Sequence, residues 1–265
     1  DDVIVAENGA SRVVVLAGRR DCTLAASSSV AVGPGPRCVV AADFDRDGRI
    51  DIATGSESDG SFSVALGRPD GSFADATTLA LGSKLLSMAV ADLNHDNLPD
   101  IVMLDNTDDE AYALLGIGAG RFGRATVDLS LGHNPTGVAV ADVNGDGQPD
   151  ILACGFNVDS LTVFNLRVGD PLSIGRDSPA PPKYFIAAAD IDGDGVKDLV
   201  RADYEKGVVS LLSGQKNGIF EERPPSGVGV IGGSPVLQRV DTGLTGPAWF
   251  ATQNDDDDDH SVSLF

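Results

Sequence analysis

The chain has 265 residues and a formal net charge of −21, from 40 acidic and 19 basic residues. This charge argues against nucleic-acid or anionic-membrane surfaces, which need basic patches, and leaves cations, basic proteins and neutral glycans as partner classes. Only 5% of the residues are aromatic and 32 are glycine, and short runs of valine and alanine alternate with turn residues, which is typical of many short β-strands.

The first segment of the chain already has a later counterpart. DVIVAENGASRVVVLAG (2–18) aligns without a gap to DIATGSESDGSFSVALG (51–67), and each predicts two strands joined by a polar turn. Between them lie Cys22 and Cys38, whose pairing in a disulfide the sequence leaves open. Cys154 stands in a later apolar strand and is predicted to be a buried free thiol.

A nine-residue motif then recurs along the chain. It occurs as DFDRDGRID (43–51), DLNHDNLPD (92–100), DVNGDGQPD (142–150) and DIDGDGVKD (190–198), with first aspartates 49, 50 and 48 residues apart. Repetition at such a period indicates supersecondary units that are stacked or arranged around an axis. Each motif stands between two short apolar segments, so it is predicted to connect the first two strands of an antiparallel repeat.

Two more strands are expected in each repeat. A third follows a polar turn, at residues 61–67, 111–116, 160–165 and 207–214, and a weaker fourth is expected near residues 77–81 and 126–131. Four antiparallel strands in about 49 residues match the length of one propeller blade. Units that start near residues 2, 51, 100, 150, 198 and 249 predict one all-β propeller domain over residues 1–265. Six blades are expected, and seven are the open alternative.

The repeated motif carries oxygen ligands in an arrangement that suits calcium. Calcium takes about six to eight oxygens from carboxylates, amide and backbone carbonyls and water, and motif positions 1, 3, 5 and 9 offer side chains while position 7 offers its backbone carbonyl. The predicted ligands are Asp43, Asp45, Asp47, Arg49 and Asp51; Asp92, Asn94, Asp96, Leu98 and Asp100; Asp142, Asn144, Asp146, Gln148 and Asp150; and Asp190, Asp192, Asp194, Val196 and Asp198.

Departures from the motif indicate which of the expected sites bind calcium more weakly or not at all. Position 6 must turn sharply and is glycine in three loops, but Asn97 stands there in the second, which is predicted to bind more weakly. A fifth frame keeps Asp241 but has Gly243, Thr245 and Trp249 at later ligand positions, so no metal is predicted there. An acidic turn can simply be solvated, but four such turns in register favour metal binding because like-charged carboxylates repel without a cation.

At these motifs the sequence resembles the FG-GAP/VCBS repeat family, whose members include the integrin α-subunit propeller and several secreted lectins and surface proteins. The resemblance spans nearly the whole chain and rests on VVAADFDRDGRID, IAAADIDGDGVKD and a Gly-x-Phe element at residues 71–73, 120–122 and 218–220. It implies an FG-GAP-type β-propeller with one calcium in each intact loop, about four ions in all. The family covers adhesion, sugar binding, scaffolding and fused enzymes, so it leaves the function open.

A non-catalytic protein-interaction, adhesion or scaffold module with structural calcium is the function that the sequence favours. A lectin that binds glycans between blades is the alternative, although no aromatic residue recurs at one blade position to form a sugar platform. An enzyme is not expected, because His95, His133 and His260 are scattered and no nucleophile elbow, phosphate loop or HExxH motif is present. The acidic turns between second and third strands, such as residues 254–260, predict a face that attracts a basic partner or further cations.

Calcium affinity also bears on where the protein works. Weak oxygen-only sites fill only where calcium is abundant, so an extracellular, secreted or cell-surface location is expected, with periplasmic or luminal locations as alternatives. No stretch of about 18 consecutive apolar residues is present, so no membrane span is predicted. The expected partner is a protein or a glycan and not nucleic acid, and membership of a larger assembly is left open.

Overall fold

A computed structural model describes most of the chain. The described residues are 2–21, 23–105, 107, 110–130, 135–155, 160–167, 170–177, 184–203, 208–215, 220–222, 238–240, 249–253 and 262–264. They belong to two compact units, residues 1–130 and 131–265, each of which is treated by itself. Apart from one 3-10 turn, Asn8–Ala10, the regular structure in these residues is antiparallel β-sheet. None of their helical segments is long and apolar enough to cross a membrane.

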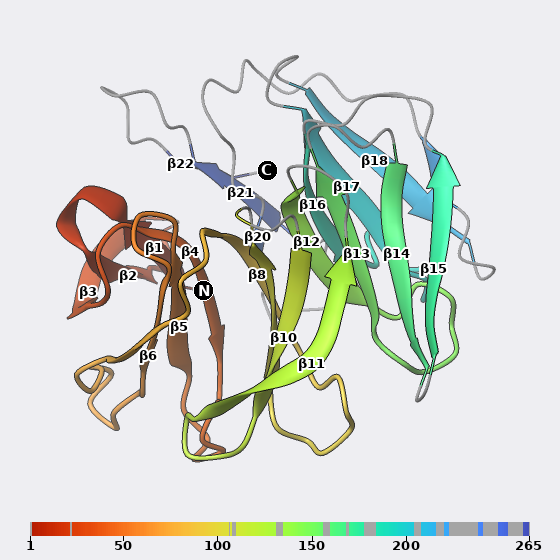
Figure 1. The fold of residues 1–265 in the computed structure, drawn as a ribbon. Coiled ribbons are helices and arrows are strands. Elements are labelled where there is room, and N and C mark those ends of the chain that lie inside the picture. The colour runs from red at the N-terminus through yellow and green to blue at the C-terminus, as the bar shows by residue number, and fades with distance from the viewer. Residues whose placement is uncertain are drawn as a thin grey trace. The chain divides into compact units, whose positions relative to one another are not determined.

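The first unit contains three sheets in which strands adjacent in sequence are adjacent in space (Figure 1). They comprise β1 (Val3–Glu7), β2 (Arg12–Gly18) and β3 (Leu24–Ala31); β4 (Pro36–Ala42), β5 (Asp51–Ser56), β6 (Ser61–Ala65) and β7 (Thr77–Ala80); and β8 (Leu85–Ala91), β9 (Asp100–Asp105), β10 (Glu110–Gly116) and β11 (Phe122–Ser130).

The second unit repeats this up-and-down order. Its strands are β12 (Pro135–Ala141), β13 (Asp150–Gly155), β14 (Ser160–Arg167) and β15 (Asp170–Asp177); β16 (Tyr184–Ala189), β17 (Asp198–Asp203), β18 (Val208–Gly214) and β19 (Phe220–Glu222); and β20 (Gln238–Val240), β21 (Trp249–Gln253) and β22 (Val262–Leu264).

These sheets confirm the predicted four-strand repeat. The second strand of each four-stranded sheet begins at position 9 of the acidic motif, as expected. The alignment of residues 2–18 with 51–67 is confirmed as well, because β1 and β2 pair as the second and third strands of a sheet and β3 follows as its fourth. The number of blades and the interpretation of residues 1–265 as one domain stay predictions.

The second strands of the four-stranded sheets in the first unit are buried on both faces. Every residue of β5 and β9 is buried, because these strands have sheet neighbours on both edges and packed side chains above and below. In the first unit, the β4–β7 and β8–β11 sheets share one apolar cluster, and the β1–β3 and β4–β7 sheets share another. The hydrophobic core of this unit therefore lies between successive sheets.

The Gly-x-Phe element supplies part of that core. The ring of Phe122 meets the rings of Phe44 and Phe62 edge to face, with centroids 5.4 Å apart in each pair. Phe73 packs against the apolar cluster shared with the β1–β3 sheet, and Phe220 packs against the cluster of the second unit that contains Val143. Each of these phenylalanines thus fills space against the preceding sheet.

Cys38 is buried and free, so the Cys22–Cys38 disulfide that the sequence left open is not formed. Its Sγ donates to the carbonyl oxygen of Gly55 at 3.7 Å, and burial raises the pKa of the thiol to about 12. Such a thiol is a small apolar side chain at neutral pH. Cys22 and the side chain of Cys154 lie outside the described part of the chain.

Candidate metal-binding loops

The four acidic motifs form the hairpin loops between the first and second strands of the four-stranded sheets. We number them loop 1 (43–51), loop 2 (92–100), loop 3 (142–150) and loop 4 (190–198). In each, the residue before position 1 pairs with position 9 across the antiparallel ladder. The structure therefore brings each predicted ligand set into one nine-residue turn and keeps the four sets in separate sheets. The fifth frame, from Asp241, lies outside the described residues.

The position-1 aspartate draws each loop around its own carboxylate. In loop 1, Asp43 accepts hydrogen bonds from the backbone N–H groups of Asp47 and Gly48, at 3.0 and 2.8 Å. Asp92 of loop 2 accepts the same pair, from positions 5 and 6, at 3.1 and 2.8 Å. In loops 3 and 4, Asp142 and Asp190 accept from the glycines at positions 4 and 6 instead, at 2.7 to 3.0 Å. In each of the four loops, backbone N–H groups of the same loop thus fix the position-1 carboxylate in place.

Two left-handed residues give the loop its shape. Position 6 has a positive φ in every loop, 85° at Gly48, 63° at Asn97, 83° at Gly147 and 84° at Gly195, which confirms the need for glycine or asparagine there. Position 4 also has a positive φ, which sequence reasoning missed. Arg46, His95, Gly145 and Gly193 adopt values of 60 to 79°. The glycines at position 4 of loops 3 and 4 were the available signal.

The position-9 aspartate is a buried clamp. Asp51 is 0% exposed, and its two carboxylate oxygens accept the N–H groups of Phe44 at 2.8 Å and Gly67 at 2.7 Å. The first bond closes the loop, and the second ties the loop to the far end of the third strand. The same pair of bonds recurs around Asp100 and Asp198. Asp150 differs, because its second oxygen accepts the side-chain amide of Asn144 at 3.2 Å.

The glycine that donates to this aspartate is a functional position that the sequence analysis missed. It lies 16 residues after position 9, as Gly67, Gly116 and Gly214. A Cβ at these glycines would lie only 2.4, 2.5 and 2.0 Å from the backbone oxygen of the position-8 residue. Asp2 accepts the Gly18 N–H with the same spacing. The signal in the sequence was this constant spacing of 16 residues.

We predict that Gly116→Ala lowers the free energy of unfolding by about 2 kcal/mol, because the added methyl group must displace the Pro99 carbonyl. Gly123→Ala is the matched control in the next strand, where the nearest atom to an added Cβ is 3.7 Å away. Urea unfolding followed by circular dichroism measures both changes. Equal losses in the two variants would contradict the role of close backbone contact at Gly116.

Carboxylates gather most closely in loops 1 and 4. Asp43, Asp45 and Asp51 place one oxygen each within 4.8 Å of one another, and Asp190, Asp192 and Asp194 do the same. Loops 2 and 3 have asparagine at position 3, so one carboxylate is replaced by an uncharged amide. Position-7 N–H groups donate to position-5 carboxylates in all four loops, at 2.8 to 2.9 Å, whereas ligation by the position-7 carbonyls of Arg49, Leu98, Gln148 and Val196 stays a prediction.

Burial makes some of these carboxylates harder to ionise. It raises the pKa of Asp51 and of Asp100 against the opposing effect of their backbone hydrogen bonds. It also raises the pKa of Asp150, to about 6, and the negative charges of Asp146 and Asp142 add to the rise. A cation would reverse this effect, because an adjacent positive charge favours the ionised carboxylate.

The raised pKa of Asp150 predicts a pH dependence. Because the folded value of about 6 exceeds the ordinary value of 3.8, the calcium-free fold binds a proton more tightly than the unfolded chain and gains stability as pH falls through this window. Calcium needs the ionised carboxylate. We therefore expect the rise in melting temperature caused by calcium to shrink between about pH 7 and pH 5. Melting scans with and without calcium at each pH test this, and a constant difference would contradict it.

The repeats also match a known family model. The model of the FG-GAP-like repeat matches three overlapping segments, residues 1–54, 43–103 and 92–153, which together cover more than half of the chain. The chain belongs to the FG-GAP-like repeat family. Each matched FG-GAP-like segment after the first starts at position 1 of an acidic loop, so the family repeat and the hairpin loops described above coincide. No match was found among curated protein sequences.

Solved structures show the fold of this FG-GAP-like repeat protein. It is similar to a Lactobacillus plantarum protein at 16% identity and a TM-score of 0.63, covering 99% of this chain and 79% of that one. It is also similar to the periplasmic gluconolactonase of Pseudomonas aeruginosa, at 15% identity and a TM-score of 0.57, covering 96% of this chain and 76% of that one. A third similar structure is BBS1N, solved in complex with ARL6DN, at 14% identity and a TM-score of 0.59, covering 99% of this chain and 73% of that one. These likenesses concern the fold, which is a β-propeller.

Proposed function

We propose that this chain is a non-catalytic calcium-binding β-propeller that acts as a protein-interaction, adhesion or scaffold module. The observation that carries the calcium assignment is the convergence of three aspartate oxygens within 4.8 Å in loops 1 and 4, on turns that already hold position 1 by two backbone N–H groups. An all-oxygen donor set of carboxylates and amides suits calcium better than a transition metal.

The calcium role that fits these loops is structural. A cation held by the predicted side-chain ligands at positions 1, 3, 5 and 9 would offset the like charges that the loop brings together. The position-9 aspartate also joins the loop to the chain that follows the third strand. The ion would thus reinforce the hairpin of each four-stranded sheet, with about one ion in each of the four loops.

The interaction role is supported by charge and by fold. The net charge of −21 favours a basic protein partner, and one solved structure of similar fold, BBS1N, is bound to a protein. Residues 254–260, the acidic turn named for this face, lie outside the described residues, so the proposed acidic face stays a prediction. Abundant calcium outside cells makes an extracellular or cell-surface location part of the proposal.

Lectin and enzyme functions are the alternatives. The gluconolactonase likeness, at 15% identity, concerns the fold and transfers no activity to this chain. Of the three histidines, His95 lies in loop 2, and His133 and His260 lie outside the described residues. Hydrolysis of a sugar lactone by the purified protein would contradict the non-catalytic proposal.

Calcium counting and partner capture test the proposal together. Equilibrium dialysis with elemental analysis is expected to find about four calcium ions per chain, and Asp194→Asn is expected to weaken one of them, whereas Asp75→Asn, at an exposed acidic residue outside the loops, leaves all of them. The immobilised protein is then exposed to extract from its native source and eluted with chelator. A specific protein supports the interaction module, and a glycoprotein displaced by simple sugars supports the lectin.

A further inference from the structure

The side chain of Arg49 places a positive charge next to the carboxylates of loop 1. Its guanidinium forms an ion pair with the Asp47 carboxylate through Nη2, while its Nε donates to the carbonyl oxygen of Gly67 at 2.9 Å. Gly67 is the residue whose N–H binds the clamp aspartate of the same loop. The Arg49 guanidinium is therefore held by two contacts, one to a predicted calcium ligand and one to the backbone just after β6.

Loop 4 has no arginine at position 7, and its carboxylates are arranged differently. Position 7 is Val196 there, and the position-5 carboxylate of Asp194 belongs to the tight cluster with positions 1 and 3. In loop 1 the cluster consists of positions 1, 3 and 9, and Asp47 is not part of it. The two loops share aspartate at all four side-chain ligand positions, so the difference coincides with the Arg49–Asp47 ion pair.

We propose that Arg49 is an internal counter-cation of loop 1, which holds Asp47 out of the cation site and makes this loop bind calcium more weakly than loop 4. The inference rests on the proposed calcium function and concerns its regulation. Calcium must separate Asp47 from Arg49 and must approach a fixed positive charge. In return, loop 1 keeps part of its charge compensation when calcium is scarce, because the guanidinium offsets the repulsion between its carboxylates.

Loops 2 and 3 have Leu98 and Gln148 at position 7, so among the four loops only loop 1 has a cationic side chain there.

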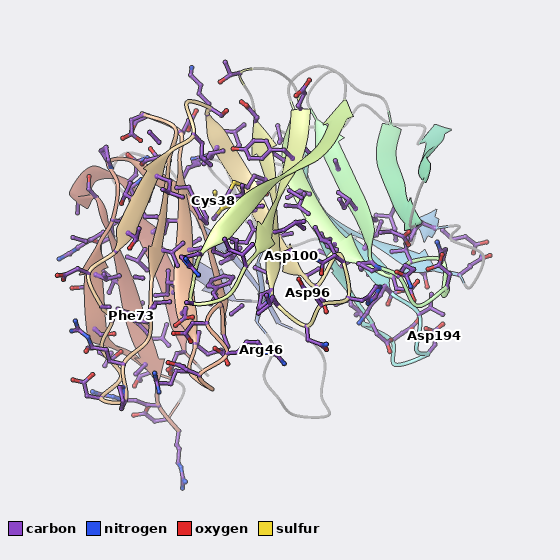
Figure 2. All side chains as sticks on the ribbon, turned by 60° about the horizontal axis from the view of Figure 1, so that its bottom comes forward. Cys38, Arg46, Phe73, Asp96, Asp100 and Asp194 are labelled. Carbon is purple, nitrogen blue, oxygen red and sulfur yellow. The ribbon has the colours of Figure 1, made fainter. Side chains whose placement is uncertain are left out.

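The same loop also provides a matched control. Arg46, at position 4, is labelled in Figure 2 and is exposed. Within the described residues, no hydrogen bond or ion pair of its side chain is found. Arg46→Gln and Arg49→Gln remove the same charge from the same loop, and both keep the backbone carbonyl of the altered residue.

The test is a calcium titration followed by the backbone amide signals of Gly48 and Gly195 in two-dimensional NMR of the full chain. These amides donate to the position-1 aspartates of loops 1 and 4, so each reports on one loop. In the unaltered protein, Gly48 is expected to respond at about tenfold higher calcium than Gly195. Arg49→Gln should lower the Gly48 midpoint by about tenfold, Arg46→Gln by less than about threefold, and neither should move the Gly195 midpoint.

Melting temperature gives a second readout that a merely structural arginine would not produce. Arg49→Gln is expected to lower the melting temperature of the calcium-free protein, since two contacts are lost, but to enlarge the increase that calcium causes. Equal shifts of the Gly48 midpoint in the two variants, or a loss of stability that is the same with and without calcium, would overturn the inference alone. No response of Gly48 or Gly195 to calcium in any of the proteins would overturn the proposed function with it.

Discussion

Asp100→Ala is expected to lower the free energy of unfolding of the calcium-free protein by about 3 kcal/mol. Asp100 is 0% exposed, and its carboxylate accepts the N–H groups of Leu93 and Gly116, both at 2.8 Å. Alanine leaves both donors without this acceptor, and a buried donor without a partner destabilises a protein by about 1 to 3 kcal/mol. Urea unfolding in the presence of chelator measures the loss.

Asp96→Ala is the matched variant in the same loop. Asp96 is exposed whereas Asp100 is buried, and Figure 2 shows both side chains. The carboxylate of Asp96 accepts the N–H of Leu98 and the side-chain amide of Asn94 at the loop surface. We expect a much smaller loss than for Asp100→Ala without calcium, but a clear loss of the stabilisation that calcium provides. If the two variants were equally unstable in chelator, position 9 would have no clamping role beyond its predicted role as a ligand.

Removal of calcium is expected to lower the melting temperature by about 10 °C or more at neutral pH. A ligand that binds only the folded state stabilises it by about 1.4 kcal/mol at ten times its dissociation constant and about 2.7 kcal/mol at a hundred times. Extracellular calcium modules bind at about 0.1 to 1 mM, so 10 mM calcium would place four loops in this range. Each kcal/mol shifts the melting temperature by about 2 to 4 °C in a chain of similar size.

Differential scanning calorimetry of protein treated with chelator and then returned to calcium measures this shift. Magnesium at the same concentration is the control, since it demands tighter octahedral geometry and gives up its water reluctantly. An unchanged melting temperature in protein shown by elemental analysis to be metal-free would contradict a structural role for calcium.

Local pattern was enough to predict the repeat, the strand order and the turn at position 6. These features depend on neighbours within a few residues, such as the apolar strand before Asp43 and the glycine at position 48. The confirmed pairing of β1 with β2 followed from comparison of residues 2–18 with 51–67. The strands β3, β15 and β19 were not located, because their segments lack a long alternating pattern.

The contacts between each loop and the chain after the third strand were not predicted, although the 16-residue spacing of aspartate and glycine was visible in the sequence. The Asp51–Gly67 hydrogen bond and the contact of Arg49 with the Gly67 carbonyl depend on how the end of β6 meets loop 1. Sheet register decides that meeting, and it is fixed only when all the strands pair. For the same reason the sequence predicted only the backbone carbonyl of Arg49 as a ligand, and the ion pair between its side chain and Asp47 was not expected.

The position of the Gly-x-Phe phenylalanine bears on how a repeat protein of this kind gains repeats by gene duplication. Phe122 serves the preceding sheet, where it contacts Phe44 inside loop 1, and the N–H of Gly120 donates to the Phe44 carbonyl at 3.3 Å. A tandem gene duplication of one full period, wherever its ends fall, copies one acidic loop and one such phenylalanine. Each new repeat therefore already encodes the phenylalanine that packs against the loop of the repeat before it. A partial duplication would separate an acidic loop from the phenylalanine that packs against it.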